Sequence, residues 1–128
     1  MSTAAQYAAT PATAMVQIAT ANTNRDGTGT LGTLITAPAA GTRVDDIQIC
    51  AAGTTTAGVI RMFLSDGTNH FLINEIIVPA ITPSTTVPAW SAILKNLGII
   101  LKSGWSLRFS TNNAETFNVA MLRGGDFT

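Results

Sequence analysis

The sequence predicts an all-β fold, namely a two-sheet antiparallel sandwich of jelly-roll type with a flexible N-terminal arm. The 128-residue chain holds 20 Thr, and this β-branched residue favours pleated sheet over helix. Short β-type runs alternate with segments dense in Gly, Pro, Asn and Asp, at a spacing of about 8–12 residues that is typical of sandwiches and barrels. With 46% apolar residues, the chain can bury one core without disulfides or metals.

Residues 1–13 are expected to form the arm, and residues 14–128 a single β-sandwich domain. The arm is mostly Ala, Thr and Ser, with one Pro and no hydrophobic periodicity. It is apolar enough to pack on a neighbouring subunit, which makes Tyr7 and Pro11 candidate interface residues. Helix propensity alone would also allow a short helix at 3–9.

The predicted strands follow one another along the chain. Two short β-type runs come first, and the third contains the stretch IQICA. The runs VIRMFL and HFLINEIIV come next, on either side of an Asp-Gly turn. Every second residue is apolar in WSLRFS and TFNVAML near the C-terminus, as in strands that bury one face. The predicted strands span 14–20, 30–36, 43–51, 58–65, 70–78, 86–94, 98–102, 104–111 and 116–122. Their number, about eight, fits a jelly roll.

Three turn segments predict β-hairpins. Asp66-Gly67 lies in the first, and this dipeptide is a strong signal for a tight turn. Ser103-Gly104 separates GIILK from WSLRFS, and TNNAE at 111–115 separates WSLRFS from TFNVAML. We therefore expect neighbouring strands to pair at all three places.

The segment that begins at Pro88 also fits a helix. Apolar residues from Trp90 to Leu97 recur at the i, i+3, i+4, i+7 spacing of one helix face. Pro88 could occupy the first helical position and Gly98 could end the helix. A strand is the preferred interpretation, because the neighbouring segments are all strands.

One motif suggests a cofactor. Gly27, Gly29 and Gly32 match the G-x-G-x-x-G pattern of dinucleotide-binding proteins. That pattern requires a following helix whose N-terminus meets the pyrophosphate, whereas the segment that follows here is β-branched and interrupted by Pro38. The acidic pair at 45–46 follows the motif at a spacing somewhat shorter than the roughly 20 residues expected for a ribose-binding acid. The motif therefore indicates a Gly-rich loop, and no cofactor is expected.

No catalytic or metal-binding residue is predicted. His70 is the single His, and it shares one tight hairpin with Ser65 and Asp66, where the three side chains cannot align as nucleophile, base and orienting acid. A lone His with no second His or Cys beside it is a poor metal site. Cys50, the single Cys, excludes an intrachain disulfide and is expected to be a small buried apolar side chain.

Three arginines are candidate interface residues. Asp45 and Asp46 would point to opposite faces of a strand, and one of them is expected to pair with Arg43 or Arg61 at a surface or subunit contact. Arg61 and Arg108 are each a single charge within an apolar strand. The simpler interpretation places both on a solvated outer face. The functional interpretation has each of them form a bidentate contact to a carboxylate of a neighbouring subunit.

The chain carries few charges. Charged residues make up 11% of it, against roughly a quarter in an average soluble domain, and seven basic residues balance seven acidic ones. No long-range field would steer the protein to nucleic acid. The N-terminus lacks the pattern of a signal peptide, and no apolar stretch approaches the roughly 20 residues of a membrane helix. Neither nucleic acid nor a membrane is an expected partner.

Four stretches of the chain resemble a known group of proteins. They are TANTNRDGTGTL, GTTTAGVIRMFLSDGTNHFLINEI, LGIILKSGWSLRFSTNNAETFNV and the terminal GGDF. They resemble the capsid decoration, or cement, proteins of tailed bacteriophages. The resemblance implies a jelly-roll-like subunit, usually trimeric, that sits on the outer capsid and clamps adjoining major capsid proteins. It also implies an N-terminal arm that crosses to a neighbour, and assembly into the virion in the host cytoplasm.

The expected function is therefore structural and not enzymatic. A homotrimer would bind the outer phage capsid and stabilise the lattice of the major capsid protein. The alternative is a carbohydrate- or receptor-binding module of a head fibre or tail, with Trp90 or Trp105 as an exposed stacking surface. A small hydrolase is a third hypothesis, which the absence of an acid–base constellation in the sequence disfavours.

Overall fold

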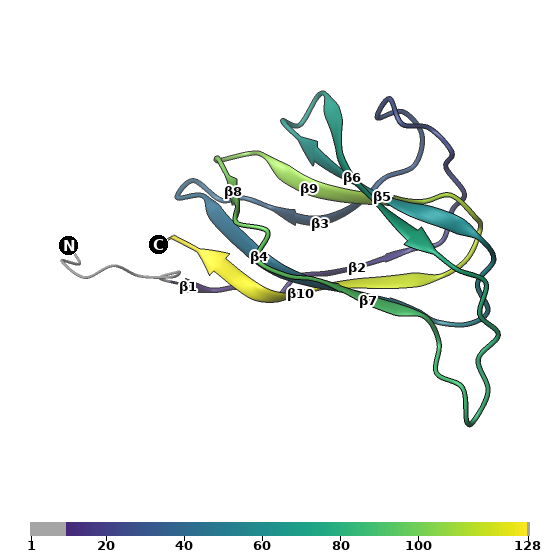
Figure 1. Cartoon of the computed structure of the whole chain (residues 1–128). Coiled ribbons are helices and arrows are strands. Elements are labelled where there is room, and N and C mark those ends of the chain that lie inside the picture. Colours follow the sequence, from purple (N-terminus) through teal and green to yellow (C-terminus); the bar gives the residue numbers. More distant parts are fainter. Residues whose placement is uncertain (1–9, 128) are drawn as a thin grey trace.

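A computed structural model describes residues 10–127 of the chain (Figure 1). These residues form ten strands and no helix, and the strands build two antiparallel sheets that lie face to face. The prediction of an all-β, two-sheet sandwich is confirmed. None of the described residues belongs to a helix long and apolar enough to cross a membrane.

The larger sheet has six strands, of which β10 and β4 form the centre. β10 pairs on one side with β1 and β2 and on the other with β4, and β4 in turn pairs with β7 and β8. The strands of this sheet are β1 (Thr10–Pro11), β2 (Met15–Ile18), β4 (Thr42–Ala51), β7 (Ser91–Leu94), β8 (Ile99–Leu101) and β10 (Phe117–Asp126).

The smaller sheet has four strands in the order β3-β9-β5-β6. They are β3 (Gly32–Thr36), β5 (Gly58–Ser65), β6 (His70–Val78) and β9 (Ser106–Thr111). From β2 onward the chain moves between the two sheets at every connection except β5–β6 and the short step from β7 to β8. The chain therefore builds the two sheets of the sandwich in alternation along most of its length.

One of the three predicted hairpins is confirmed and two are wrong. At the β5–β6 turn, Asp66 Oδ1 accepts hydrogen bonds from the backbone N–H groups of Thr68 (2.9 Å) and Asn69 (2.7 Å), and Gly67 has a φ of 101°. By contrast, β8 and β9 belong to different sheets, and so do β9 and β10. The turns at Gly104 and at 111–115 end a strand, as predicted, but they send the chain across to the opposite sheet.

The core lies between the sheets and is formed by alternate residues of the long strands. Phe117 is 1% exposed and its ring lies edge-on to that of Trp90, with ring centroids 5.9 Å apart. The segment around Trp90 forms strand β7 and not a helix, so the preferred interpretation of that segment is confirmed, although the strand is shorter than predicted. The largest fully buried side chains of this core include Phe109, Phe117, Ile47, Ile49, Ile60, Leu101 and Leu107.

The ends of the described chain lie together. Thr10 pairs with Asp126 and Pro11 with Gly125, so the last part of the predicted arm is hydrogen-bonded to β10. β10 itself runs four residues beyond its predicted end, through an irregularity at Arg123. The rest of the predicted arm, including Tyr7 and the possible helix at 3–9, lies outside the described residues.

Candidate protein-binding surface

The outer face of the six-stranded sheet is defined by the strand register. Residues directly opposite one another in an antiparallel pair share a face. Ala120 lies opposite Met15 on one side and Gln48 on the other, and Gln48 lies opposite Ile93. The neighbours of these residues along β4 and β10 are buried in the core. This row of four residues therefore points away from the core.

Large apolar side chains on this outer face are exposed. Met15 on β2 is 67% exposed, Ile93 on β7 49%, Ile100 on β8 69% and Leu122 on β10 53%. The water-facing side of an antiparallel sheet is normally polar. Four exposed apolar side chains from four strands make this face a candidate interaction surface. We call this surface, formed by Met15, Ile93, Ile100 and Leu122, the exposed sheet face.

The charges beside the exposed sheet face are paired within the chain. Arg43 Nε donates to Asp45 Oδ2 at 2.9 Å, a pairing that the sequence predicted, and Arg123 Nε lies 3.2 Å from Asp46 Oδ2. The β4–β10 register is irregular here, because Asp46 lies opposite Arg123 whereas Val44 lies opposite the next residue of β10. This irregularity breaks the simple alternation assumed for the two aspartates, and each carboxylate has its own arginine.

Cys50 also lies on the outer side of β4. It is directly opposite Asn118 on β10 and Ser91 on β7, and it is half-buried. The expectation of a fully buried small side chain is therefore wrong. The thiol lies one row away from Ile93, at the margin of the exposed sheet face.

The part of the outer face of the four-stranded sheet around Arg61 is covered by the chain itself. The connection between β2 and β3 reaches across to β6 (Figure 1), where Arg25 Nε donates to both carboxylate oxygens of Glu75 at 3.0 Å. Gly27 in this connection has a φ of 88°, and a Cβ at this position would collide with the carbonyl oxygen of His70. The loop therefore packs backbone against backbone on β6.

Arg61 lies beneath this loop, with a side chain that is 3% exposed. Its Nε donates to Glu75 Oε2 at 3.0 Å, Nη1 to the carbonyl oxygen of Asn22 at 3.1 Å and Nη2 to Asn112 Oδ1 at 3.2 Å. The side chain is thus neither solvated nor accessible to a neighbouring subunit. Its carboxylate partner belongs to its own chain, which disagrees with both sequence interpretations of this arginine.

Arg108 and Pro11 are more accessible. Arg108 lies opposite Phe63 on β5, is half-buried, and donates from Nε to Ser106 Oγ at 3.0 Å. Pro11 is exposed on β1. The structure does not bring these two residues together with Arg43 into one patch, since Arg43 and Pro11 belong to the six-stranded sheet and Arg108 to the other.

The Gly-rich motif forms a loop, as the sequence indicated. Asn22 Nδ2 donates to the carbonyl oxygens of Thr28 and Thr30, each at 3.0 Å, and so closes the loop on itself. Strand β3 begins at Gly32, the last glycine of the motif. The helix that a dinucleotide site requires does not follow it.

Ser65 and His70 are hydrogen-bonded across the β5–β6 turn. His70 Nδ1 lies 2.7 Å from Ser65 Oγ, but Ser65 is fully buried. The Asp66 carboxylate is bonded to the turn backbone and does not orient the imidazole. The pair therefore lacks both an accessible nucleophile and an orienting acid. Among residues 10–127, no three His, Cys, Asp or Glu side chains gather as a metal site would require.

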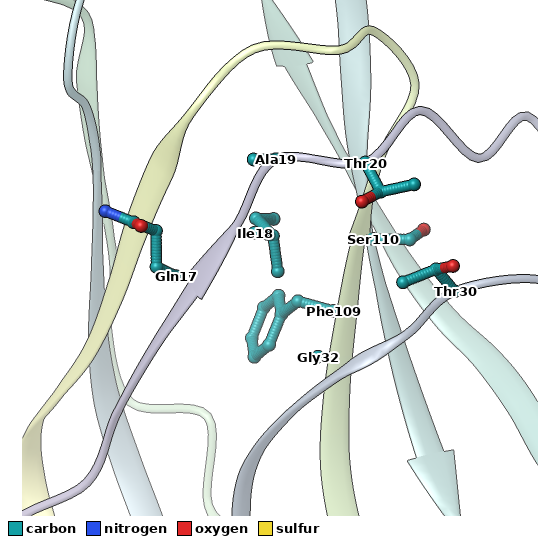
Figure 2. Close-up of a pocket in the computed structure, with 8 residues that line it drawn as sticks. All are labelled: Gln17, Ile18, Ala19, Thr20, Thr30, Gly32, Phe109 and Ser110. Carbon is teal, nitrogen blue, oxygen red and sulfur yellow. The ribbon is translucent and has the colours of Figure 1, made fainter.

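A small pocket lies where the chain passes from β2 to β3. Figure 2 shows the Phe109 ring facing Ile18 on one side, and Thr20, Thr30 and Ser110 on the other. Its volume is about 80 Å³, which is room for water molecules. Ser110 Oγ is buried without a hydrogen-bond partner among the described residues, and water in this pocket would satisfy it.

Neither tryptophan forms a flat exposed platform. Trp90 is 8% exposed and packs edge-on against Phe117. Trp105 is half-buried against the core. The surface that the carbohydrate-binding hypothesis assigned to Trp90 is therefore not available.

The sequence interpretation missed the residues of the exposed sheet face. A signal for some of them was present, because Ile99-Ile100-Leu101 are consecutive apolar residues in one strand, and one of three such residues must point outward. Ile93 and Leu94 give the same signal in β7. Met15 and Leu122 were not distinguishable from core residues by pattern alone.

The fold and its surfaces define an all-β, two-sheet sandwich with an exposed apolar sheet face. No protein-family model matches the chain, and no curated protein sequence matches it significantly. β-Sandwiches serve many unrelated functions, so the fold alone does not assign one.

Glu75 predicts a measurable pH dependence. The hydrogen bond from Arg25, together with the charges of Arg25 and Arg61, lowers the pKa of the Glu75 carboxyl below its ordinary value in spite of partial desolvation. A lowered folded-state pKa contributes stability that is present above the unfolded-state value and is lost as the pH falls through the folded-state pKa.

We therefore expect the stability difference between wild type and Glu75→Gln to be full at pH 7. It should shrink once the pH falls below about 4.3, the ordinary pKa of Glu. Urea titrations of both proteins from pH 7 to pH 2.5 measure this difference. A difference that stays constant over the whole range would show that ionisation of Glu75 does not stabilise the fold.

Proposed function

We propose that this protein is a structural virion protein. It binds the outer capsid of a tailed phage as a homotrimer and stabilises the lattice of the major capsid protein. The observation that carries the proposal is the presence of two separate apolar surfaces on a chain whose charges balance. A protein that joins its own copies and also holds a lattice needs two contact regions.

The second surface is the free edge of β6. This nine-residue strand pairs with β5 on one side, while its other edge has no partner strand among the described residues. Phe71, Ile73 and Ile77 on it are 50%, 44% and 78% exposed. Such an edge presents a row of unpaired N–H and C=O groups that an extended segment of another protein can complete. The carboxylate of Glu75 on this strand forms ion pairs with both Arg25 and Arg61.

Many copies bound in this way would act together on the lattice. Each contact can be modest, because simultaneous binding of several sites on one oligomer raises the overall affinity. Low charge and abundant Thr suit extensive and partly hydrated contacts. The resemblance of four sequence stretches to capsid decoration proteins supports the same function.

The test is co-sedimentation of the purified protein with phage heads that lack it. Wild type should saturate the heads and raise their disruption temperature. Ile77→Glu, which places a charge on the β6 edge, should reduce occupancy at least about tenfold, the effect of losing roughly 1.4 kcal/mol per site. Val87→Glu is the matched control, since Val87 is 44% exposed and lies outside both surfaces. Wild type that does not bind heads at saturating concentration would refute the proposal.

A further inference from the structure

We infer that the exposed sheet face packs against a second copy of this chain. The inference rests on the proposed function, because that function requires several copies of the chain to associate. It adds which surface joins the copies. The capsid contact is then left to the β6 edge on the other sheet.

The first argument is the apolar character of the face. Interfaces between permanently associated copies are more apolar than those with partners that fold separately and bind later. Met15, Ile93, Ile100 and Leu122 come from four different strands, and all four are about half exposed or more. The two outward rows at Gln48 and Cys50 hold only uncharged residues beside Met15 and Ile93, namely Ala120, Gln48, Asn118, Cys50, Ser91 and Gln17, whereas Arg43, Asp46 and Arg123 lie in the rows toward Ile100.

The second argument is charge. Two arginines and two aspartates at the face form the pairs Arg43–Asp45 and Arg123–Asp46 within one chain. These four charges therefore add no excess of like charge to a contact between two copies. A partner recognised through complementary charge would instead leave a net positive or negative patch here.

The third argument is size. β4 and β10 are ten residues long, which corresponds to about 33 Å at roughly 3.3 Å per residue. Four strand positions side by side span about 19 Å at roughly 4.8 Å each. The flat area of about 600 Å² is close to the roughly 800 Å² of accessible surface that each partner contributes to a standard interface, since side-chain relief adds to the flat area.

The experiment measures the mass of the full chain in solution, without heads, across a range of protein concentrations. We expect wild type to contain two or more copies. The double variant I93E/I100E should weaken self-association by at least about 30-fold, the effect of losing one interface hot spot. Ile77→Glu is the matched control, because Ile77 is equally apolar and 78% exposed but lies on the other sheet, and it should leave the mass unchanged. Circular dichroism confirms that each variant is folded.

A second measurement needs no variant. The single thiol, Cys50, lies on the same side of β4 as the exposed sheet face. Its rate of labelling by a thiol reagent should fall at least about tenfold as wild type is concentrated from its monomeric to its assembled range. A labelling rate independent of concentration would contradict the proposed interface.

The outcomes separate this inference from the proposed function. If wild type has the mass of a monomer at every concentration, the inference is overturned. If I93E/I100E also prevents binding to heads in that case, the capsid protein covers the exposed sheet face. An oligomer that I93E/I100E leaves intact and Ile77→Glu dissociates also overturns it. An oligomer that dissociates only in I93E/I100E but never binds heads supports the inference and refutes the proposed function.

Discussion

Phe117→Ala is expected to destabilise the protein by about 3–5 kcal/mol, the usual cost of removing a buried Phe side chain. Phe117 is 1% exposed at the start of β10 and lies against Trp90, which reaches it from the segment before β7. Its removal costs both the transfer free energy of the ring and the cavity that remains, because β10 is held on both sides by paired strands and cannot collapse into the space.

Thermal and urea unfolding measure this effect. For a chain of this length the melting temperature should fall by roughly 10–20 °C. Phe71→Ala is the matched control, since Phe71 is the same residue type but 50% exposed on β6, and it should cost less than half as much. Equal losses for the two variants would contradict the position of Phe117 in the core.

Arg61→Ala is expected to cost about 3 kcal/mol, as for the removal of one partner of a buried ion pair. The carbonyl oxygen of Asn22 and Oδ1 of Asn112 each accept a hydrogen bond from the guanidinium, and truncation removes both bonds. It also removes one of the two arginines bonded to Glu75. The loop between β2 and β3 should loosen as well, because Asn22 is one of its anchors.

Two readouts test this prediction. Unfolding curves should show the loss of stability, and hydrogen exchange should become faster at residues 22–31. Arg25→Ala is the matched control, because Arg25 binds the same carboxylate but its side chain is 63% exposed, and exposed pairs are worth about 1 kcal/mol or less. If both variants cost the same, the buried hydrogen bonds of Arg61 are not what stabilises the loop.

Much of the fold was predictable because its signals are local. The runs at 58–65 and 70–78 coincide with β5 and β6, since each is a mostly apolar run of strand length and Asp66-Gly67 between them favours a tight turn. Turn chemistry shows where a strand ends, but not which strand pairs with the next one. For this reason the turn at Gly104 was expected to form a hairpin although it crosses between sheets.

The candidate site was less predictable because it depends on distant contacts. The pattern places Arg61 on the outer side of β5, and only the loop that begins 39 residues earlier at Asn22 buries it there. The irregular register between Asp46 and Arg123 depends on how β4 meets β10, which no local pattern encodes. The exposure of Ile93 and Ile100 likewise depends on which side of the sheet the core occupies.

The pairing of β1 with the end of β10 has a practical consequence. Figure 1 shows both ends of the described chain at the same end of the sandwich, and Thr10 lies opposite Asp126. A reporter or antigen joined directly at Thr10 or at Phe127 would therefore project from the same end of the sandwich. Cargo joined directly at these two residues would be displayed in equivalent positions, so the described domain offers two interchangeable attachment points for particle engineering.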